Sequence, residues 1–540
     1  MNDKLHEAMN EISDKHLWEA ETYQKRPFPY WIAAAAALLA LVITLAAAFG
    51  GNPATPGTSN PLLEHNQPSS PFFPTGPSSS IKPTIFPTTP PTIPPTIPPT
   101  IPPTIPPTTP PTSPKPSGIL PPDSPVFANL AAAPTYPQMV RCPQIMDFTN
   151  FKDYQAAMDA YLSAQKAQYN QPDGYADSLT NFFAASIAQF LQGDGNTAYS
   201  PLNVYMAMAM LAETTGGNSR QQILDLFGAN SIEELRTQAG HVWNAHYCDD
   251  GRSTILMANS LWLDHQFPYH QEAADTLAQY YYASTFHGDL GTEAVDQQLR
   301  DWLNANTGDL LKEQANNVKL SPETVFSLAS TIYFTAGWTD EFSEKHTYDE
   351  TFHTPTGDIQ TPFMHQTRRD TYYRGTNFGA ICLELGDSNR MWLILPDEGY
   401  ATEDILQSDE YLRLTLDPGS WYGITYKIHL SLPKFDVVQQ QDLIGGMRQL
   451  GITDVFNSAA SDFSPISDMA GLFISQINHA ARVTIDEEGC TAAAFTVMDA
   501  PSAGMPSEIE ELHFTLDRPF LFIISSRDNL PLFAGIVKEP

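Results

Sequence analysis

The fold of this chain is decided by the stretch Thr484-Ile485-Asp486-Glu487-Glu488-Gly489-Cys490-Thr491-Ala492-Ala493-Ala494-Phe495-Thr496-Val497-Met498. Two acidic residues precede Gly489, whose missing β-carbon permits backbone angles suited to a hinge. Side chains alternate between the two faces of a strand, and every second residue here is small or uncharged: Cys490, Ala492, Ala494, Thr496 and Met498. Taken alone, the stretch fits an exposed loop that can become a strand, an ordinary surface loop, or an alanine-rich helix start.

Further motifs follow and precede this stretch. Downstream come Phe514-Thr515-Leu516-Asp517-Arg518-Pro519-Phe520-Leu521-Phe522-Ile523-Ile524 and Pro531-Leu532-Phe533-Ala534-Gly535. Upstream, in chain order, come Ala198-Tyr199-Ser200-Pro201-Leu202, Ala258-Asn259-Ser260-Leu261-Trp262, Thr331-Ile332-Tyr333-Phe334, Leu432-Pro433-Lys434-Phe435 and Leu450-Gly451-Ile452. The hinge stretch and these ordered motifs together resemble the serpin family of serine protease inhibitors, over roughly residues 174–540.

Helical and β-rich segments alternate along the chain, which predicts an α+β domain. We expect helices at Asp153 to Gln168, Tyr175 to Leu191 and Val295 to Leu303, and buried strands at Met391 to Pro396 and Leu521 to Ile524. The resemblance implies a serpin fold with large, mainly antiparallel sheets, about nine helices and an exposed reactive-centre loop.

The composition restricts the partners. The 61 acidic residues outnumber the 28 basic ones and give a formal net charge of -33. Such a surface repels phosphate backbones, so nucleic-acid binding is not expected, and neither is a polyanion cofactor, which would need a basic face. The four cysteines have no metal-ligand spacing, and the sequence does not decide whether one disulfide forms.

The N-terminal region is predicted to contain a membrane anchor. Residues 1–29 are polar, and the run at residues 30–50 is apolar, long enough at about 1.5 Å per residue to cross a bilayer core. Lys25 and Arg26 precede this run, so residues 1–29 are expected in the cytoplasm and the rest outside the cell. Alternatively, Ala46-Ala47-Ala48 serves as a signal cleavage site and the protein is secreted.

A stalk follows the apolar run. Residues 51–123 carry many of the 46 prolines, including four repeats of Thr-Ile-Pro-Pro from Thr92 to Pro107. Proline lacks the backbone donor of helices and sheets, so this Pro/Thr-rich stretch is expected to be an extended, disordered spacer. Residues 124–540 then form the serpin domain, with residues 124–173 as an N-terminal extension. The expected protein is a single-pass cell-surface serpin of a membrane-anchored bacterial type.

No enzyme motif is present. The sequence has no Gly-x-Ser-x-Gly elbow, no phosphate-binding Gly-Lys-Ser/Thr loop and no His-Glu-x-x-His pair, so we expect neither catalysis nor a metal or other cofactor. The resemblance instead implies a monomeric suicide inhibitor whose covalent partner is a serine protease, with a cysteine protease as the other candidate. A non-inhibitory serpin acting as a surface binding module and a stalked adhesin remain alternative functions.

The resemblance also assigns roles to residues of the loop. The hinge comprises Glu487, Glu488, Gly489, Cys490, Thr491, Ala492, Ala493 and Ala494. Counting along the loop from Gly489 in the commonest family register places the reactive bond between Ala503 and Gly504, with Ser502-Ala503 and Gly504-Met505 as alternatives. A methyl side chain at Ala503 suits an elastase-like or subtilisin-like pocket and offers nothing to a pocket that requires Arg or Lys.

Two further groups of residues are implied by the same resemblance. A polar cluster beneath the main sheet, the shutter, comprises Ser200, Asn203, Ser330 and His479. The family commonly has Ser and Asn in place of Asn203 and Ser330, so the exchange is expected to retain one amide and one hydroxyl. Trp338 is placed at the top of the sheet, in the breach, where the hinge begins to insert.

Overall fold

The computed structural model describes residues 130–132, 134, 142–143, 148–249, 253–490 and 509–540. The predicted cytoplasmic segment, anchor and stalk lie outside the described residues, as do the hinge residues from Thr491 onward and the reactive-bond residues Ser502, Ala503, Gly504 and Met505. Among the described helices, none combines the length and the apolar character needed to cross a bilayer.

The described residues contain eleven α-helices. They are α3 (Phe151–Tyr169), α4 (Thr180–Phe190), α5 (Pro201–Thr214), α6 (Gly217–Phe227), α7 (Ile232–His246), α8 (Gln271–Tyr280), α9 (Glu293–Asn306), α10 (Lys312–Ala315), α11 (Thr402–Leu406), α12 (Glu410–Leu416) and α13 (Ile444–Gln449). The expected α+β class is confirmed, and helices as short as α10 explain why the number exceeds the nine or so expected.

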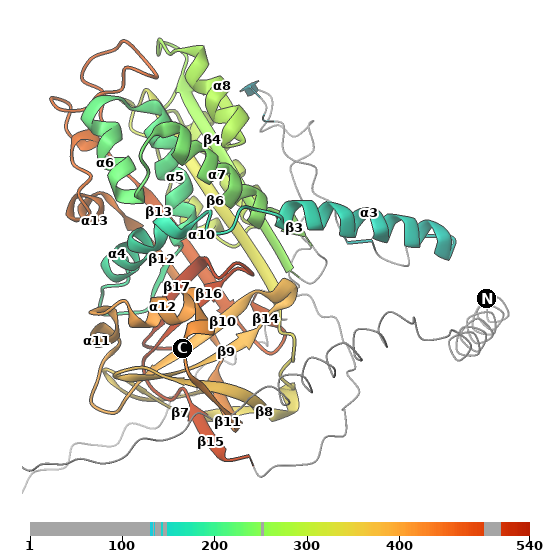
Figure 1. Cartoon of the computed structure of the whole chain (residues 1–540). Coiled ribbons are helices and arrows are strands. Elements are labelled where there is room, and N and C mark those ends of the chain that lie inside the picture. The colour runs from blue at the N-terminus through green and yellow to red at the C-terminus, as the bar shows by residue number, and fades with distance from the viewer. Residues whose placement is uncertain (1–129, 133, 135–141, 144–147, 250–252, 491–508) are drawn as a thin grey trace, which may run out of the picture. The chain divides into compact units, whose positions relative to one another are not determined.

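Two large sheets form the framework (Figure 1). The eight-stranded main sheet runs in the order β1 (Leu130–Ala132), β5 (Ala283–Gly288), β4 (Ser253–Asp264), β6 (Phe326–Gly337), β14 (Gly489–Cys490), β13 (Asn478–Ile485) and β12 (Phe435–Asp442), with β3 (Cys248–Asp249) beside β4. The β4–β5 pair is parallel and the other pairs of this sheet are antiparallel.

The second sheet has nine strands. Its order is β15 (Glu511–Thr515), β11 (Gly423–Pro433), β8 (Gly357–Arg374), β9 (Phe378–Glu384), β10 (Arg390–Pro396), β16 (Phe520–Ser525), β17 (Pro531–Val537) and β2 (Thr197–Tyr199), with β7 (Thr347–Thr354) beside β8. Only β11 and β15 pair in parallel among its described strands. The expected mainly antiparallel sheets are therefore confirmed.

Helix α5 lies in the core and contacts both β6 of the main sheet and β17 of the second sheet. Pro201 opens the helix, because its fixed φ angle suits the first helical position and its missing N–H costs nothing there. Ser200 precedes it in an extended conformation, and Leu202, Tyr205 and Met206 are fully buried. The start of α5 is thus held rigidly beneath the main sheet.

Most of the elements predicted from sequence patterns are present. The two apolar runs form β10 and β16, and every residue of β16 is buried. The helix expected at Asp153 to Gln168 is α3, and the helix expected at Val295 to Leu303 is the longer α9. The helix expected from Tyr175 begins only at Thr180, because Gly174 has a φ of +71° and tight 3-10 turns follow it up to Leu179.

Helix α3 precedes the region that carries the serpin-like motifs. The side chain of Asn150 accepts a hydrogen bond from the Asp153 N–H at 3.0 Å and caps the helix start. At the other end, the guanidinium of Arg527 lies 3.0 Å from the centroid of the Tyr169 ring, and the Tyr169 hydroxyl donates to Asp387. These contacts fix the end of α3 on the loops that join the strands of the second sheet.

Candidate functional site

The candidate site begins where the hinge stretch enters the main sheet. Gly489 pairs with Gly337 and Cys490 pairs with Ala336 of β6, while Cys490 also pairs with Ile485 at the end of β13. Cys490 is 3% exposed. The resemblance implies a loop held outside the sheet, whereas the structure places the first two loop residues inside it, because Cys490 is small and apolar enough to be buried there.

Gly489 is required by its surroundings. Its φ is +148°, and a β-carbon at this position would lie 2.3 Å from the carbonyl oxygen of Ala336. Any other residue would push β14 away from β6. At this predicted hinge residue the two backbones therefore lie too close together for a side chain between them.

Trp338 holds the turn before β14 by two hydrogen bonds. Its backbone N–H donates to the carbonyl oxygen of Glu488 at 3.0 Å, and its indole Nε1–H donates to the carbonyl oxygen of Asp486 at 2.9 Å. The side chain is 5% exposed. Trp338 therefore lies against the turn Asp486–Glu488 that leads into β14.

Glu487 is tied to β7 and to the turn between β11 and β12. Its carboxylate accepts a hydrogen bond from Lys434 Nζ at 2.7 Å and another from Thr347 Oγ1 at 2.8 Å. Burial acts to raise the pKa of Glu487, but these two donors outweigh it and leave the pKa below its ordinary value of 4.5. The carboxylate is therefore charged at neutral pH and fastens the hinge to the rest of the molecule.

Sequence reasoning missed the partners of Glu487. Lys434 stands in the motif Leu432-Pro433-Lys434-Phe435, and nothing in that pattern pairs it with a residue 53 positions away. Thr347 lies on β7 of the second sheet and carries no sequence signal. Both partners become visible only when the two sheets are assembled.

The four expected shutter residues meet as two pairs at the start of α5. The Ser200 N–H donates to Nε2 of His479 on β13 at 3.1 Å, and the Ser200 hydroxyl donates to the carbonyl oxygen of Leu532 at 2.7 Å. Burial lowers the pKa of His479 to about 4, so the ring is neutral and accepts at Nε2.

The second pair joins α5 to the neighbouring strand. The Ser330 hydroxyl on β6 donates to Oδ1 of Asn203 at 2.7 Å. Ser200 and Asn203 are three residues apart at the start of one helix, so α5 holds β13 through one pair and β6 through the other. This contact therefore pairs the amide of Asn203 on the helix with the hydroxyl of Ser330 on the strand.

The inner edges of β6 and β13 are the remaining feature of the site. Within the described residues, β6 and β13 are joined only through Gly489 and Cys490 of β14. Beyond these two residues, the edge of β6 that faces β13 has no ladder partner among the described residues. The same is true of the edge of β13 that faces β6. The Thr335 hydroxyl on β6 donates to the carbonyl oxygen of Cys490 at 3.2 Å and so fastens the end of β14 to β6.

Comparison with known proteins identifies the family. The family model described as Serpin (serine protease inhibitor) matches residues 178–540, which is more than half of the chain. The chain belongs to the serpin family. This serpin is 29% identical over 407 residues to the alpha-1-antiproteinase S of Cavia porcellus, covering 70% of this chain and 94% of the relative. It is also 29% identical over 359 residues to the leukocyte elastase inhibitor of Homo sapiens, covering 64% and 93%.

Solved structures agree on the serpin fold. The native state of Tengpin, a thermophilic serpin, has a TM-score of 0.61 at 23% identity, with 69% of this chain and 95% of that chain covered. A serpin of the insect Tenebrio molitor has a TM-score of 0.59 at 20% identity, with 69% and 99% covered. Both curated relatives named above are inhibitors of proteases by name, which supports an inhibitory role for this serpin.

Proposed function

We propose that this serpin inhibits serine proteases by offering residues 491–508 as a substrate and then inserting the cleaved loop into its main sheet. The arrangement of β6, β14 and β13 carries this proposal. The two residues of β14 already pair with both β6 and β13, and below them the facing edges of β6 and β13 have no ladder partner among the described residues. Strand addition at these edges would add ladder hydrogen bonds and bury apolar side chains.

The register of β14 predicts where each inserted residue would lie. Cys490 faces Ala336 on β6 and Ile485 on β13. Continued without a bulge, the same register brings Thr496 opposite both Ser330 and His479. The inserted hydroxyl would therefore arrive between the two polar pairs at the start of α5, where it has hydrogen-bond partners.

The covalent step proceeds as an interrupted hydrolysis. The protease serine oxygen attacks the carbonyl carbon of Ala503, and the amide nitrogen of Gly504 leaves after it takes up a proton. The resulting ester joins the protease to Ala503, which is the new end of the freed loop. Insertion then pulls the joined protease away from its working geometry before water breaks the ester. Serpin loop insertion is a known example of stored strain that is released by a conformational switch.

The target class follows from the residue before the cut. Ala503 presents only a methyl group, so we propose an elastase-like or subtilisin-like serine protease as the partner, with a cysteine protease less well matched. Substitution of Ala503 by Arg should create a partner for a trypsin-like pocket, which recognises a cation with an acidic group. If the cut instead lies at Ser502-Ala503 or Gly504-Met505, mass spectrometry of the nicked protein will give that bond.

We also propose that residues 30–50 anchor this serpin in a membrane, with residues 51–123 as a stalk and the inhibitor outside the cell. The acidic composition suits an exposed, soluble domain. Secretion after cleavage near Ala48 is the alternative arrangement. N-terminal sequencing of the protein recovered from the membrane fraction and from the medium distinguishes the two.

The deciding experiment is incubation with an elastase-like protease followed by denaturing electrophoresis. We expect a band at the summed mass of the protease and the large fragment, and we expect it to survive boiling. A matched incubation with the protease inactivated at its serine should give no such band. Complete cleavage without a covalent band would refute inhibition and favour the second candidate, a non-inhibitory surface binding module.

A further inference from the structure

Helix α9 lies on the face of the main sheet that is opposite to α5. Adjacent residues of a strand point to opposite faces, and while Ser330 of β6 bonds to α5, the preceding Ala329 packs against the apolar cluster beneath α9. This cluster is separate from the main core and includes Val295, Leu299 and Trp302 of the helix. Helix α9 is therefore seated on the sheet by a small core of its own.

The chain that follows α9 crosses from β6 to β13. We call residues 307–315, which include α10, the connector. Gly308 lies against the ring of Tyr333 on β6, where a β-carbon would be 2.7 Å from Cε2 of that ring. Two residues further on, the carbonyl oxygen of Leu310 accepts a hydrogen bond from Nη1 of Arg482 on β13 at 3.2 Å. The connector thus bridges the two strands that β14 joins.

Tyr333 and Arg482 would flank the same residue of an inserted strand. Tyr333 is three residues before Ala336, which pairs with Cys490 of β14, and Arg482 is three residues before Ile485, the other partner of Cys490. Both side chains reach the connector, so the side chain of a residue placed between them would point toward the connector as well. Because the connector already contacts the Tyr333 ring, a strand entering at this level would have to displace it.

The guanidinium group of Arg482 is oriented by a neighbouring strand. Its Nε and Nη2 donate to the two carboxylate oxygens of Asp436 on β12, at 2.9 and 2.6 Å, and leave Nη1 for Leu310. Such paired hydrogen bonds fix the plane of the guanidinium and hence the direction of its third donor. A lysine could keep an ion pair with Asp436, but it has no planar fork and could not hold the carboxylate and the carbonyl in the same way.

We propose that Arg482 is a latch for strand insertion, in which its hydrogen bond to Leu310 holds the connector across β6 and β13 until a strand enters. This inference rests on the proposed function, because a latch has a role only if the main sheet accepts a strand. Breaking the bond frees the connector at β13, so the barrier to insertion falls while the pairing of β12 with β13 is kept. Arg482 is thus a positioning residue that acts through the connector.

The test measures how fast the uncleaved full chain takes up a fluorescent peptide that has the sequence of residues 491–503. Arg482→Lys should take up this peptide about tenfold faster than the parent protein, which is the factor expected for the loss of one charge-assisted hydrogen bond. Gly308→Ala acts on the other attachment, because its methyl group would collide with the Tyr333 ring, and it should also speed uptake.

Arg374→Lys is the matched control. Arg374 pairs with both carboxylate oxygens of Asp397, as Arg482 does with those of Asp436, but it lies on β8 of the second sheet. Its uptake rate should equal that of the parent. If Arg482 served stability alone, Arg482→Lys would lower the denaturant midpoint without faster uptake.

Two results would overturn the latch, and they differ in what they say about inhibition. Uptake by Arg482→Lys at the parent rate, or equal acceleration in Arg374→Lys, would refute the latch and leave the proposed inhibition intact. If neither the parent nor any variant takes up the peptide, and nicking the loop does not raise the melting temperature, the sheet accepts no strand. That result would refute the proposed inhibition and the latch with it.

Discussion

The hydroxyl of Ser330 on β6 donates a hydrogen bond to Oδ1 of Asn203 on α5 across 2.7 Å. The donor is on the strand that borders the expected insertion path, and the acceptor is on the core helix beneath it. In the proposed insertion, Thr496 would arrive opposite Ser330 and could compete for this bond. The pair is therefore suited to set how readily the sheet opens.

Exchanging the two residue types tests this pair. Asn203→Ser alone and Ser330→Asn alone should each lower the free energy of unfolding by about 1 kcal/mol, because each leaves a half-buried polar group poorly partnered. The double exchange should recover most of that loss, since one amide and one hydroxyl are again present. Denaturant unfolding of the four proteins measures the coupling, and strictly additive losses would show that the two side chains do not act together.

His479 predicts a pH dependence of stability. Its pKa is lowered by burial to about 4, against an ordinary 6.5, so the folded state binds fewer protons than the unfolded state between these values. Its contribution is complete above pH 6.5 and is lost as the pH falls toward 4, by roughly 3 kcal/mol in total. His479→Gln keeps an acceptor without titrating, so its stability should vary less between pH 7 and 4.

The control for this titration is His353→Gln. His353 is exposed and hydrogen-bonded to Asp358, which raises its pKa above 6.5, so its contribution is present at low pH and fades as the pH rises. Its replacement should steepen the loss of stability at acid pH, which is the opposite sign. If the two variants have the same pH profile as the unchanged protein, the assignment of the titration to His479 is wrong.

Removal of the Lys434–Glu487 pair should loosen the hinge. Lys434→Met leaves the carboxylate of Glu487 with only Thr347, and we expect a stability loss of about 1 kcal/mol at neutral pH together with faster spontaneous loop insertion. The pKa of Glu487 is depressed, so its contribution is present above pH 4.5 and fades below it. Denaturant unfolding at neutral and acid pH measures the loss, which should fade over the same range.

Lys427→Met provides the comparison for Lys434. Lys427 also lies 2.7 Å from a carboxylate, that of Glu511, but both side chains of that pair are about half exposed. Exposed ion pairs contribute little to stability. Lys427→Met should therefore leave the half-life of the active inhibitor at 37 °C close to that of the parent protein. Equal loss of active inhibitor in both variants would mean that charge number, and not the hinge contact, governs the effect.

Neighbouring loop residues should differ sharply in their tolerance of charge. Thr496→Arg would place a cation between Ser330 and His479 on insertion, where burial of an unpaired charge is costly. Val497→Arg would place the same cation on the opposite, solvent-facing side. We expect the first variant to be cleaved as a substrate and the second to form covalent complex, as measured by the ratio of complex to cleaved protein on a denaturing gel. Similar ratios would contradict the register derived from β14.

Much of this fold follows from local patterns. The strands β10 and β16 are predictable because each is a short, continuous apolar run. Helix α3 is predictable because its alanine-rich sequence has a high helix propensity. The start of α4 does not follow from composition, since the tight turns after Gly174 depend on its positive φ angle.

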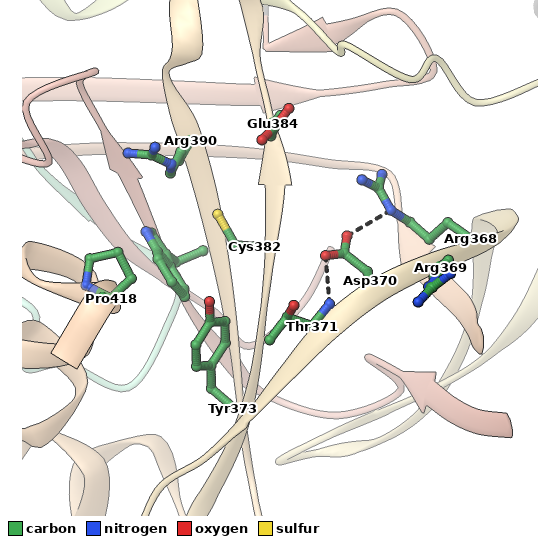
Figure 2. Close-up of a pocket in the computed structure, with 11 residues that line it drawn as sticks. Arg368, Arg369, Asp370, Thr371, Tyr373, Cys382, Glu384, Arg390 and Pro418 are labelled. Carbon is green, nitrogen blue, oxygen red and sulfur yellow. Dashed lines mark hydrogen bonds and ion pairs between the residues drawn. The ribbon is translucent and has the colours of Figure 1, made fainter. Parts of the chain in front are cut away.

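Features that join distant segments needed the assembled structure. The two donors to Glu487 come from β7 and from the turn between β11 and β12. A polar cavity of about 490 Å³ on the second sheet is lined by residues of β8, β9 and β10 and of the short turn after α12 (Figure 2). The insertion of Cys490 into the main sheet also depends on Ala336 and Ile485, which are far from each other in the chain. Family resemblance indicated the hinge and Trp338, but not these contacts.

The last two strands have a consequence for the nicked molecule. β16 and β17 are fully buried and lie between β10 and β2, while β15 pairs with β11. A cut at Ala503-Gly504 would separate the polypeptide into two pieces, yet the short C-terminal piece would supply three interior or flanking strands of a sheet. The cleaved inhibitor should therefore appear as one species in native mass spectrometry and separate into two pieces only when denatured. Its small C-terminal fragment should then stay with the trapped protease instead of diffusing away.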